Sequence, residues 1–262
     1  MYSYENTVKY SLDSLPFIRD IIYRDSVGST NVLAEELART GRGEWTVVVA
    51  DSQSNGRGRQ GRVWFSPSRI NIYTSFILRP EISYEYFPAI SLLAGMVVAI
   101  VIEHFVNMPA ELKWPNDVMV EDKKISGVLL ALGTDLNNKS YIVVGIGINV
   151  NSDTKEYPDY ITTSSTSMRL LTNKVFDRSS VLNYLYTVFH EWYNMYCVHN
   201  GFNGIREQFM RRFKMTGKQV NILNGTEKLS GTVEDIDKYG RLVLKSNNNE
   251  TIAVKSGDVH LI

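Results

Sequence analysis

The distribution of apolar and polar residues in the first hundred positions predicts a mixture of strands and helices. Three blocks at 18–25, 46–50 and 71–78 are rich in β-branched and aromatic residues and have the length and pattern of strands. Residues 31–39, NVLAEELAR, are instead amphipathic and contain good helix formers, so they predict a helix. A longer apolar stretch at 88–106 indicates a buried helix.

The same mixed pattern continues through the next hundred residues. Residues 110–132 predict several strands separated by turns, and residues 141–151 predict a further strand. Helices are expected at about 178–197 and 201–214. These elements together predict an α+β fold in which helices pack on a mixed β-sheet.

After Phe213 the pattern changes to short alternating strands joined by Asn-Gly, Tyr-Gly and Asn-rich turns, with no helix signal. We therefore expect two domains: a main domain over 1–214 and a small β-barrel over 215–262. The second domain is too short for its core alone to guarantee independent stability.

Composition and charge argue against several functional classes. The 262 residues include 28 basic and 28 acidic side chains, so no net positive charge marks the chain as a nucleic-acid binder. The lone Cys197 excludes an intramolecular disulfide and a cysteine zinc cluster, and the four histidines have no metal-ligand spacing, so no metal site is assignable. The longest apolar run has eleven residues, which is too short to span a membrane. A cytoplasmic protein without a membrane partner is expected.

The segment SQSNGRGRQGRVWF, residues 52–65, is the main candidate for ligand binding. Backbone amides turned by its glycines can surround an anion, and its arginines suit carboxylate and phosphate groups. We expect such a loop to be disordered until an anion orders it and closes it over the ligand. An arginine–glycine loop that contacts RNA, or nothing, is the other interpretation. The residues concerned are Gly56, Arg57, Gly58, Arg59, Gly61, Arg62, Trp64 and Phe65.

Three further segments carry candidate polar groups. In LKWPNDV, the proline fixes the preceding backbone as extended, so Lys113 has a defined direction at a strand end. In GIGINVN, Gly145 and Gly147 lie on one strand face and leave it bare for a flat ligand. In SVGSTN, Ser29 to Asn31 offer small polar groups at a strand-to-helix turn. Each segment also has a simpler interpretation. Lys113 could be an ordinary solvated lysine, the bare glycine face could be covered by another protein segment, and Ser29 to Asn31 could be an ordinary helix cap.

Taken together, in this order, these segments resemble those of the biotin protein ligases. The resemblance covers about residues 18–262 and implies a fold of the class II aminoacyl-tRNA synthetase and biotin ligase kind, followed by a small SH3-like domain. The matching motifs are STN at 29–31, GRGRxGRxW at 56–64, KWPNDV at 113–118, SGVL at 126–129 and GIGINVN at 145–151.

The resemblance implies a reaction in two steps. Biotin and ATP, with Mg²⁺ bound to the ATP, give biotinyl-5′-AMP and pyrophosphate. The ε-amino group of a lysine on a biotin carboxyl carrier protein then takes the biotinyl group. Closure of the 52–65 loop would shield the mixed anhydride from water.

The resemblance also implies roles for individual residues. Lys113, Arg57 and Arg59 would be catalytic, with Lys113 placed between the biotin carboxylate and the α-phosphate. Biotin would contact Ser29, Thr30, Asn31, Gln53, Gly56, Arg57, Lys113, Gly127, Gly145 and Gly147. The nucleotide would contact Arg59, Arg62, Trp64, Asn116 and Asn149, with Trp64 near the adenine.

The sequence departs from the family pattern at two places. The STN turn begins at Ser29, so a preceding winged-helix domain has no room; we expect no repressor function and no DNA partner. Ala131 stands where many members have a glutamate, so a role for that carboxylate does not transfer. Whether the protein is a monomer or a homodimer stays open.

Two rival functions remain for comparison. A lipoate or octanoate ligase shares the fold and the acyl-adenylate chemistry, but those families lack the GRGRxGRxW segment. An RNA-binding module would use the same arginines with Trp64 stacked on a base, and it would need basic residues along a groove.

Overall fold

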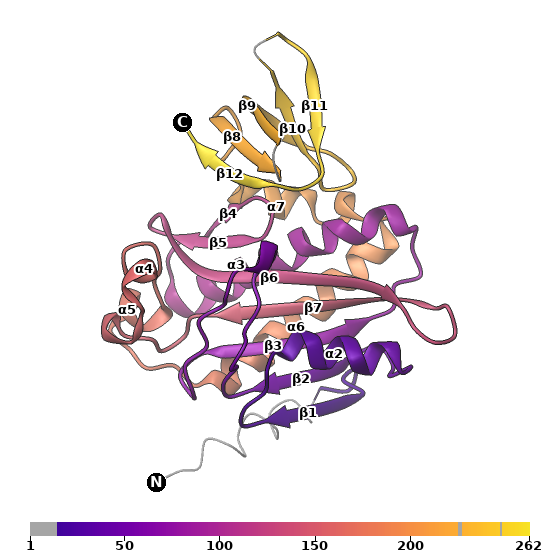
Figure 1. Cartoon of the computed structure of the whole chain (residues 1–262), viewed down its shortest axis with the longest axis vertical. Coiled ribbons are helices and arrows are strands. Elements are labelled where there is room, and N and C mark those ends of the chain that lie inside the picture. The colour runs from indigo at the N-terminus through magenta and orange to yellow at the C-terminus, as the bar shows by residue number, and fades with distance from the viewer. Residues whose placement is uncertain (1–14, 225–226, 247) are drawn as a thin grey trace.

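A seven-stranded mixed sheet forms the body of the molecule (Figure 1). The computed structural model describes residues 15–224, 227–246 and 248–262, so the first fourteen residues of the predicted main domain lie outside the described part. The strand order is β1-β2-β3-β7-β6-β5-β4. The strands are β1 (Asp20–Arg24), β2 (Thr46–Ala50), β3 (Ile72–Leu78), β4 (Glu111–Lys113), β5 (Asp117–Val120), β6 (Lys123–Thr134) and β7 (Ser140–Ile148).

Helices cover both faces of this sheet. On one face, α2 (Thr30–Arg39) packs Ala34 and Ala38 against a small apolar cluster that includes Val48. The larger core lies on the other face, where α3 (Ile90–Val106) and α6 (Arg178–Val198) pack together. Both faces are buried, which explains why the β2 sequence TVVVA is a continuous apolar run rather than an alternating one.

The predicted helix at 201–214 is shorter than expected, because a 3₁₀ turn (Phe202–Gly204) precedes the α-helix Arg206–Arg212. The other predicted strands and long helices are present, with one difference at β7. This strand ends at Ile148, so Asn149 and Asn151 do not continue the strand face of Gly145 and Gly147. Three shorter helices complete the main domain: α4 (Asp159–Thr162), α5 (Met168–Thr172) and α7 (Arg206–Arg212).

The helix predicted at 88–106 is α3, and it is a core helix. Together with the preceding 3₁₀ turn, residues Tyr84–Val106 are long and apolar enough to cross a membrane. However, 72% of the most apolar 18-residue window is buried inside the protein. Contacts with α6 and with four strands of the sheet account for this burial.

The C-terminal part is a small antiparallel sheet that stands on the main domain (Figure 1). This confirms the predicted small β-domain, and its described strands pair in the open order β11-β10-β9-β8-β12. The indole of Trp114 donates a hydrogen bond to the Gly240 carbonyl at 3.0 Å, which attaches this sheet to the β4–β5 turn. The strands are β8 (Gln219–Asn224), β9 (Glu227–Ile236), β10 (Leu242–Lys245), β11 (Thr251–Val254) and β12 (Asp258–Leu261).

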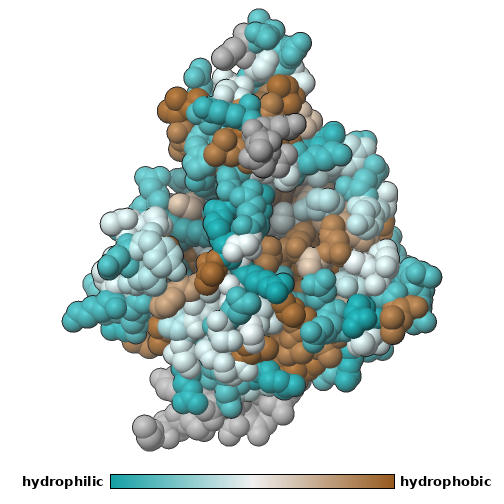
Figure 2. Space-filling model, viewed as in Figure 1, coloured by the Kyte–Doolittle hydropathy of each residue, from teal (hydrophilic) through white to brown (hydrophobic). Residues whose placement is uncertain are grey.

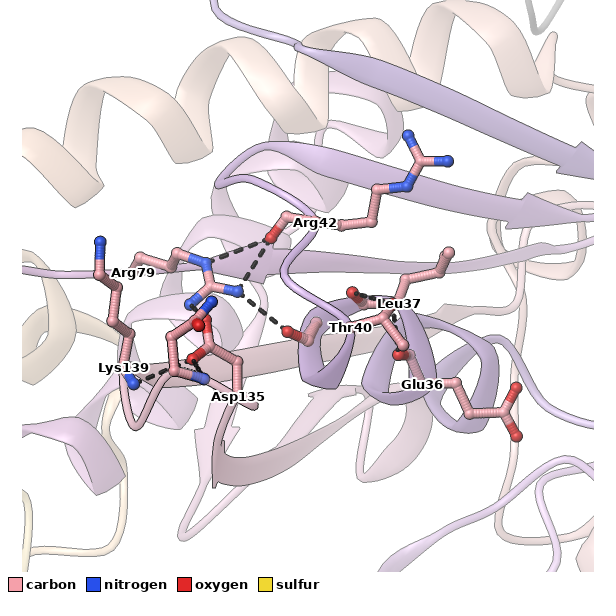
Figure 3. Close-up of polar contacts among 9 residues, drawn as sticks. Glu36, Leu37, Thr40, Arg42, Arg79, Asp135 and Lys139 are labelled. Carbon is pink, nitrogen blue, oxygen red and sulfur yellow. Dashed lines mark hydrogen bonds and ion pairs between the residues drawn. The ribbon is translucent and has the colours of Figure 1, made fainter.

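A polar network fixes the end of the main sheet at which β3 finishes (Figure 3). Arg79 Nη1 lies 2.8 Å from Asp135 Oδ2, and Arg79 Nη2 donates to the carbonyls of Ala38 and Arg42. The other Asp135 oxygen accepts the backbone N–H groups of Asn137 and Lys139. One arginine therefore joins α2, β3 and the β6–β7 hairpin.

Candidate functional site

A cleft of about 610 Å³ lies between the main sheet and the C-terminal sheet. Hydrophilic residues gather on the surface where these two parts meet (Figure 2). The cleft is bounded by the turns after β1 and β2, the β4–β5 turn, β6, β7 and β12. The predicted site residues that line it are Ser29, Thr30, Asn31, Gln53, Arg57, Arg59, Arg62, Trp64, Lys113, Asn116, Gly127, Gly145, Gly147 and Asn149.

Gly56 is the exception among the predicted residues, because it does not line the cleft. It is buried, and a β-carbon there would lie 2.5 Å from the Trp64 carbonyl oxygen and 2.7 Å from Ser66 Oγ. The structure therefore does not place Gly56 on the surface of the cleft, and its expected contact with biotin stays a prediction. Gly56 instead permits close packing at the base of the loop.

The bare glycine face predicted on β7 is present, and protein side chains lie directly on it. We call the adjoining faces of Gly127 and Gly147 the glycine floor. Gly127 and Gly147 are partners in the β6–β7 pairing, so their bare faces adjoin. A β-carbon at Gly147 would lie 2.5 Å from Trp64 Nε1, and one at Gly145 would clash with Asn31 Oδ1. The indole N–H of Trp64 is buried and has no hydrogen-bond partner among the described residues.

The STN turn forms a polar wall beside this floor. Gln53 Oε1 accepts the backbone N–H of Thr30 at 2.8 Å, and its Nε2 donates to Ser66 Oγ at 3.0 Å. Asn31 Nδ2 donates to the Leu129 carbonyl at 3.1 Å. Ser29 occupies the N-cap position of α2 but makes no side-chain capping bond, so its hydroxyl is not used by the helix.

The glycine–arginine loop has a defined hairpin form in this structure. Gly58 N donates to the Arg62 carbonyl at 2.7 Å, and Trp64 N donates to the Gly56 carbonyl at 2.9 Å. The tip turns through Gln60 and Gly61, whose φ angles of 54° and 74° are left-handed. Glycine suits this turn because it adopts positive φ without strain. The expected ordering by an anion stays a prediction.

Two of the three loop arginines contact other parts of the protein. Arg59 Nη1 donates to Asn116 Oδ1 at 3.1 Å, and Arg62 Nη2 lies 2.6 Å from Asp258 Oδ1. Burial lowers the pKa of Arg59, whereas nearby Asp258 and Asp117 raise it. A guanidinium has an ordinary pKa far above neutrality, so Arg59 stays charged. Positive charge is thus concentrated at one end of the cleft.

Lys124 is a cleft residue that the sequence interpretation missed. Its Nζ lies 2.6 Å from Asp117 Oδ1 and 5.5 Å from the centroid of the Trp64 ring. Its side chain also adjoins the bare face of Gly127, since Cε lies 3.3 Å from an added β-carbon. Lys113 lines the cleft from the end of β4.

The segment after β7 forms another wall that was not predicted. Tyr157, Tyr160 and Ile161 line the cleft from this segment. It is held to β6 because Lys124 N donates to the Ser164 carbonyl and Thr166 N donates to the Lys124 carbonyl. These contacts join positions that are distant in the sequence, so no local sequence pattern could predict them.

Ala131, where the family glutamate is missing, belongs to a different environment. It lies on β6 and packs against the apolar cluster under α2, and it does not line the cleft. An alanine is compatible with this apolar contact.

Comparisons with known proteins agree with the fold. Residues 23–149 match the Biotin/lipoate A/B protein ligase family, and residues 216–261 match the Biotin protein ligase C terminal domain. The chain is 33% identical to the bifunctional ligase/repressor BirA of Bacillus subtilis over 98% of this chain and 78% of that protein. It is 31% identical to the biotin–[acetyl-CoA-carboxylase] ligase of Mycobacterium tuberculosis over 88% of this chain and 85% of that one.

A solved structure of a biotin protein ligase has the same fold. The biotin protein ligase of Aquifex aeolicus, in complex with biotin and ATP, superposes with a TM-score of 0.79 at 30% identity. The match covers 93% of this chain and 99% of that chain.

Proposed function

Because this chain belongs to the family of biotin protein ligases, we propose that it activates biotin with ATP and transfers it to a biotin carboxyl carrier protein. In the first step a biotin carboxylate oxygen attacks the α-phosphorus of ATP and pyrophosphate leaves. In the second, the amine of a carrier lysine attacks the acyl carbon, AMP leaves and an amide forms. The observation that carries the proposal is one cleft that joins a glycine floor to a cluster of arginines.

The biotin end of the cleft is the floor of Gly127 and Gly147 with the STN turn beside it. The hydroxyl of Ser29 and the charge of Arg57 suit the polar groups of biotin. Trp64 supplies an apolar ring and an unpaired N–H over the same floor. Its place next to Gly147 supports a contact with biotin rather than the adenine contact expected from the sequence.

The biotin carboxylate and the α-phosphate of ATP would meet between the biotin end and the nucleotide end of the cleft. Charge that develops on the α-phosphate needs a fixed cation in a site from which water is excluded. Lys124 fits this role because Asp117 holds its ammonium group beside Trp64 and the floor. Lys113, the lysine chosen from the sequence, also lines the cleft, and the comparison of the two is a test of the proposal.

The nucleotide end contains Arg59, Arg62 and Asn116, whose donors suit phosphate. Tyr157 and Tyr160 offer ring surface for the base. Asn149 lines the same region, although its amide donates to the Thr166 carbonyl at 3.0 Å.

Mg²⁺ enters this proposal as part of the substrate MgATP. Among the described residues, no group of three or more acidic, histidine or cysteine side chains could hold a metal ion. The two carboxylates of the cleft, Asp117 and Asp258, are already paired with Lys124 and Arg62. Triphosphate oxygens are therefore the expected ligands of the ion.

We place the activity in the cytoplasm, where ATP is available, and we propose the ligase activity without DNA binding. The balance of 28 basic and 28 acidic residues supports this, since DNA binding depends on positive charge. The lipoate ligase alternative has less support because the C-terminal match is to a biotin ligase domain. The RNA-binding alternative also has less support, because the residue ranges that match known families match ligase families.

The direct test is the complete reaction with purified components. Purified protein, biotin and MgATP are incubated with a biotin carboxyl carrier domain, and the carrier mass is measured. The proposal predicts the mass increase of one biotinyl group and no increase when the carrier lysine is replaced by arginine. Absence of any increase with an active acceptor, while a control ligase modifies it, would contradict the proposal.

A further inference from the structure

Strand β12 of the C-terminal sheet contributes to the cleft through Asp258, which contacts the glycine–arginine loop. Both carboxylate oxygens of Asp258 contact Arg62 Nη2, at 2.6 and 2.7 Å. The carbonyl of the neighbouring Gly257 accepts a hydrogen bond from Arg59 Nη2 at 3.4 Å. Two adjacent contacts therefore fasten the loop to the C-terminal sheet.

These contacts use the groups that a phosphate would need. Carboxylate and phosphate are the two anions that match a guanidinium, so Asp258 and a nucleotide phosphate compete for Arg62. The side chain of Asp258 is 26% exposed and that of Arg62 is 59% exposed. Separation of the pair therefore leaves neither charge buried without a partner.

We propose that Asp258 holds Arg62 and the loop against the C-terminal sheet before the nucleotide binds, and that nucleotide phosphates then replace Asp258 on Arg62. This proposal rests on the proposed function, because it assigns the same cleft a nucleotide. A contact that exists only before binding stabilises that state and lowers the apparent affinity for ATP. Repulsion between Asp258 and the phosphates acts in the same direction. Asp258 is thus a positioning residue that sets the nucleotide affinity.

The first test is the KM for ATP in pyrophosphate exchange at saturating biotin. For Asp258→Asn, this KM falls by about two- to fivefold, the range that corresponds to a partly exposed ion pair, and the KM for biotin is unchanged. Asp258→Ser changes the KM for ATP in the same direction. An unchanged or raised KM for ATP in both variants overturns the exchange of Asp258 for phosphate.

The matched control is Asp235→Asn. Asp235 lies on the same C-terminal sheet and pairs with Arg206 at 2.7 Å, but it does not line the cleft. Its loss removes one carboxylate from the same sheet, so a general effect of charge would appear in this variant too. The expected result is an unchanged KM for ATP, and an equal fall in this control overturns the proposal.

The second test does not depend on biotin turnover. Trypsin cleaves after arginine, so the rate of cleavage within the loop at Arg57, Arg59 and Arg62 reports how firmly the loop is held. Without nucleotide, Asp258→Asn is cleaved faster than both the wild-type protein and Asp235→Asn. Equal rates overturn the contact as a restraint on the loop. A wild-type protein without biotin-dependent exchange contradicts the proposed function, while this comparison still tests the restraint.

Discussion

The indole of Trp64 lies against Gly147 so closely that a β-carbon on this glycine would sit 2.5 Å from the indole nitrogen. The same indole is 3.1 Å from the position of a β-carbon on Gly127. The two glycines thus make room for one aromatic ring, and that ring comes from the glycine–arginine loop. The loop and the sheet therefore meet at one surface of the cleft.

We predict that Gly147→Ala weakens biotin binding by at least about tenfold, because the added methyl group displaces Trp64 from the floor. Isothermal titration calorimetry with biotin measures the change directly. Gly28→Ala is the control, since a β-carbon at Gly28 meets no atom within 4 Å. Equal affinities for wild type and Gly147→Ala would show that the position of Trp64 over the floor is not needed for biotin binding.

A second prediction compares the two lysines that line the cleft. Lys124→Gln lowers kcat/KM for biotin-dependent pyrophosphate exchange by at least about 100-fold, as loss of a transition-state cation does. Lys113→Gln lowers it by less than about tenfold, because no hydrogen bond or ion pair from the described residues holds the Lys113 ammonium group on the floor. Thermal unfolding of both variants serves as the control for folding. The reverse order of effects would restore Lys113 as the catalytic lysine.

The network around Arg79 and Asp135 predicts a pH-dependent contribution to stability (Figure 3). Hydrogen bonds from the backbone N–H groups of Lys139 and Asn137, with Arg79, hold the pKa of Asp135 below its ordinary value of 3.8. The fold therefore favours the carboxylate form. Its contribution is fully present above the unfolded-state pKa of about 3.9 and is lost as the pH falls through the lower pKa of the folded state.

Asp135→Asn should accordingly lower the midpoint of thermal unfolding at pH 7 by at least about 2 °C. The difference from the wild-type protein should shrink as the pH falls below about 4. Asp20→Asn is the control, because Asp20 and Arg42 form an exposed pair that contributes little. A difference for Asp135→Asn that is constant from pH 7 to pH 3 would contradict this account.

The sequence was sufficient to predict the strands and helices whose buried residues follow a simple pattern. The run TVVVA predicted β2 to the residue because both faces of that strand are buried. The motif residues predicted for the site line one cleft, except Gly56, which is buried at the base of the loop; the roles of these residues stay predictions.

The remaining site residues depend on contacts between distant parts of the chain. Lys124 was passed over because its place beside Trp64 depends on packing of the distant 52–65 loop on β6, and its ion pair with Asp117 forms only after β5 and β6 pair. Asp258 reaches Arg62 across 196 positions of sequence. Such contacts have no local periodicity, so pattern reasoning does not find them.

ATP–pyrophosphate exchange with biotin, lipoate or octanoate as the only acid is the most direct test of the proposed activity. We expect exchange with biotin alone, and loss of that exchange in Arg57→Ala, whose arginine lines the cleft. Exchange with lipoate or octanoate in place of biotin would contradict the proposed substrate and keep the adenylation chemistry. The absence of exchange with all three acids would contradict the ligase activity itself.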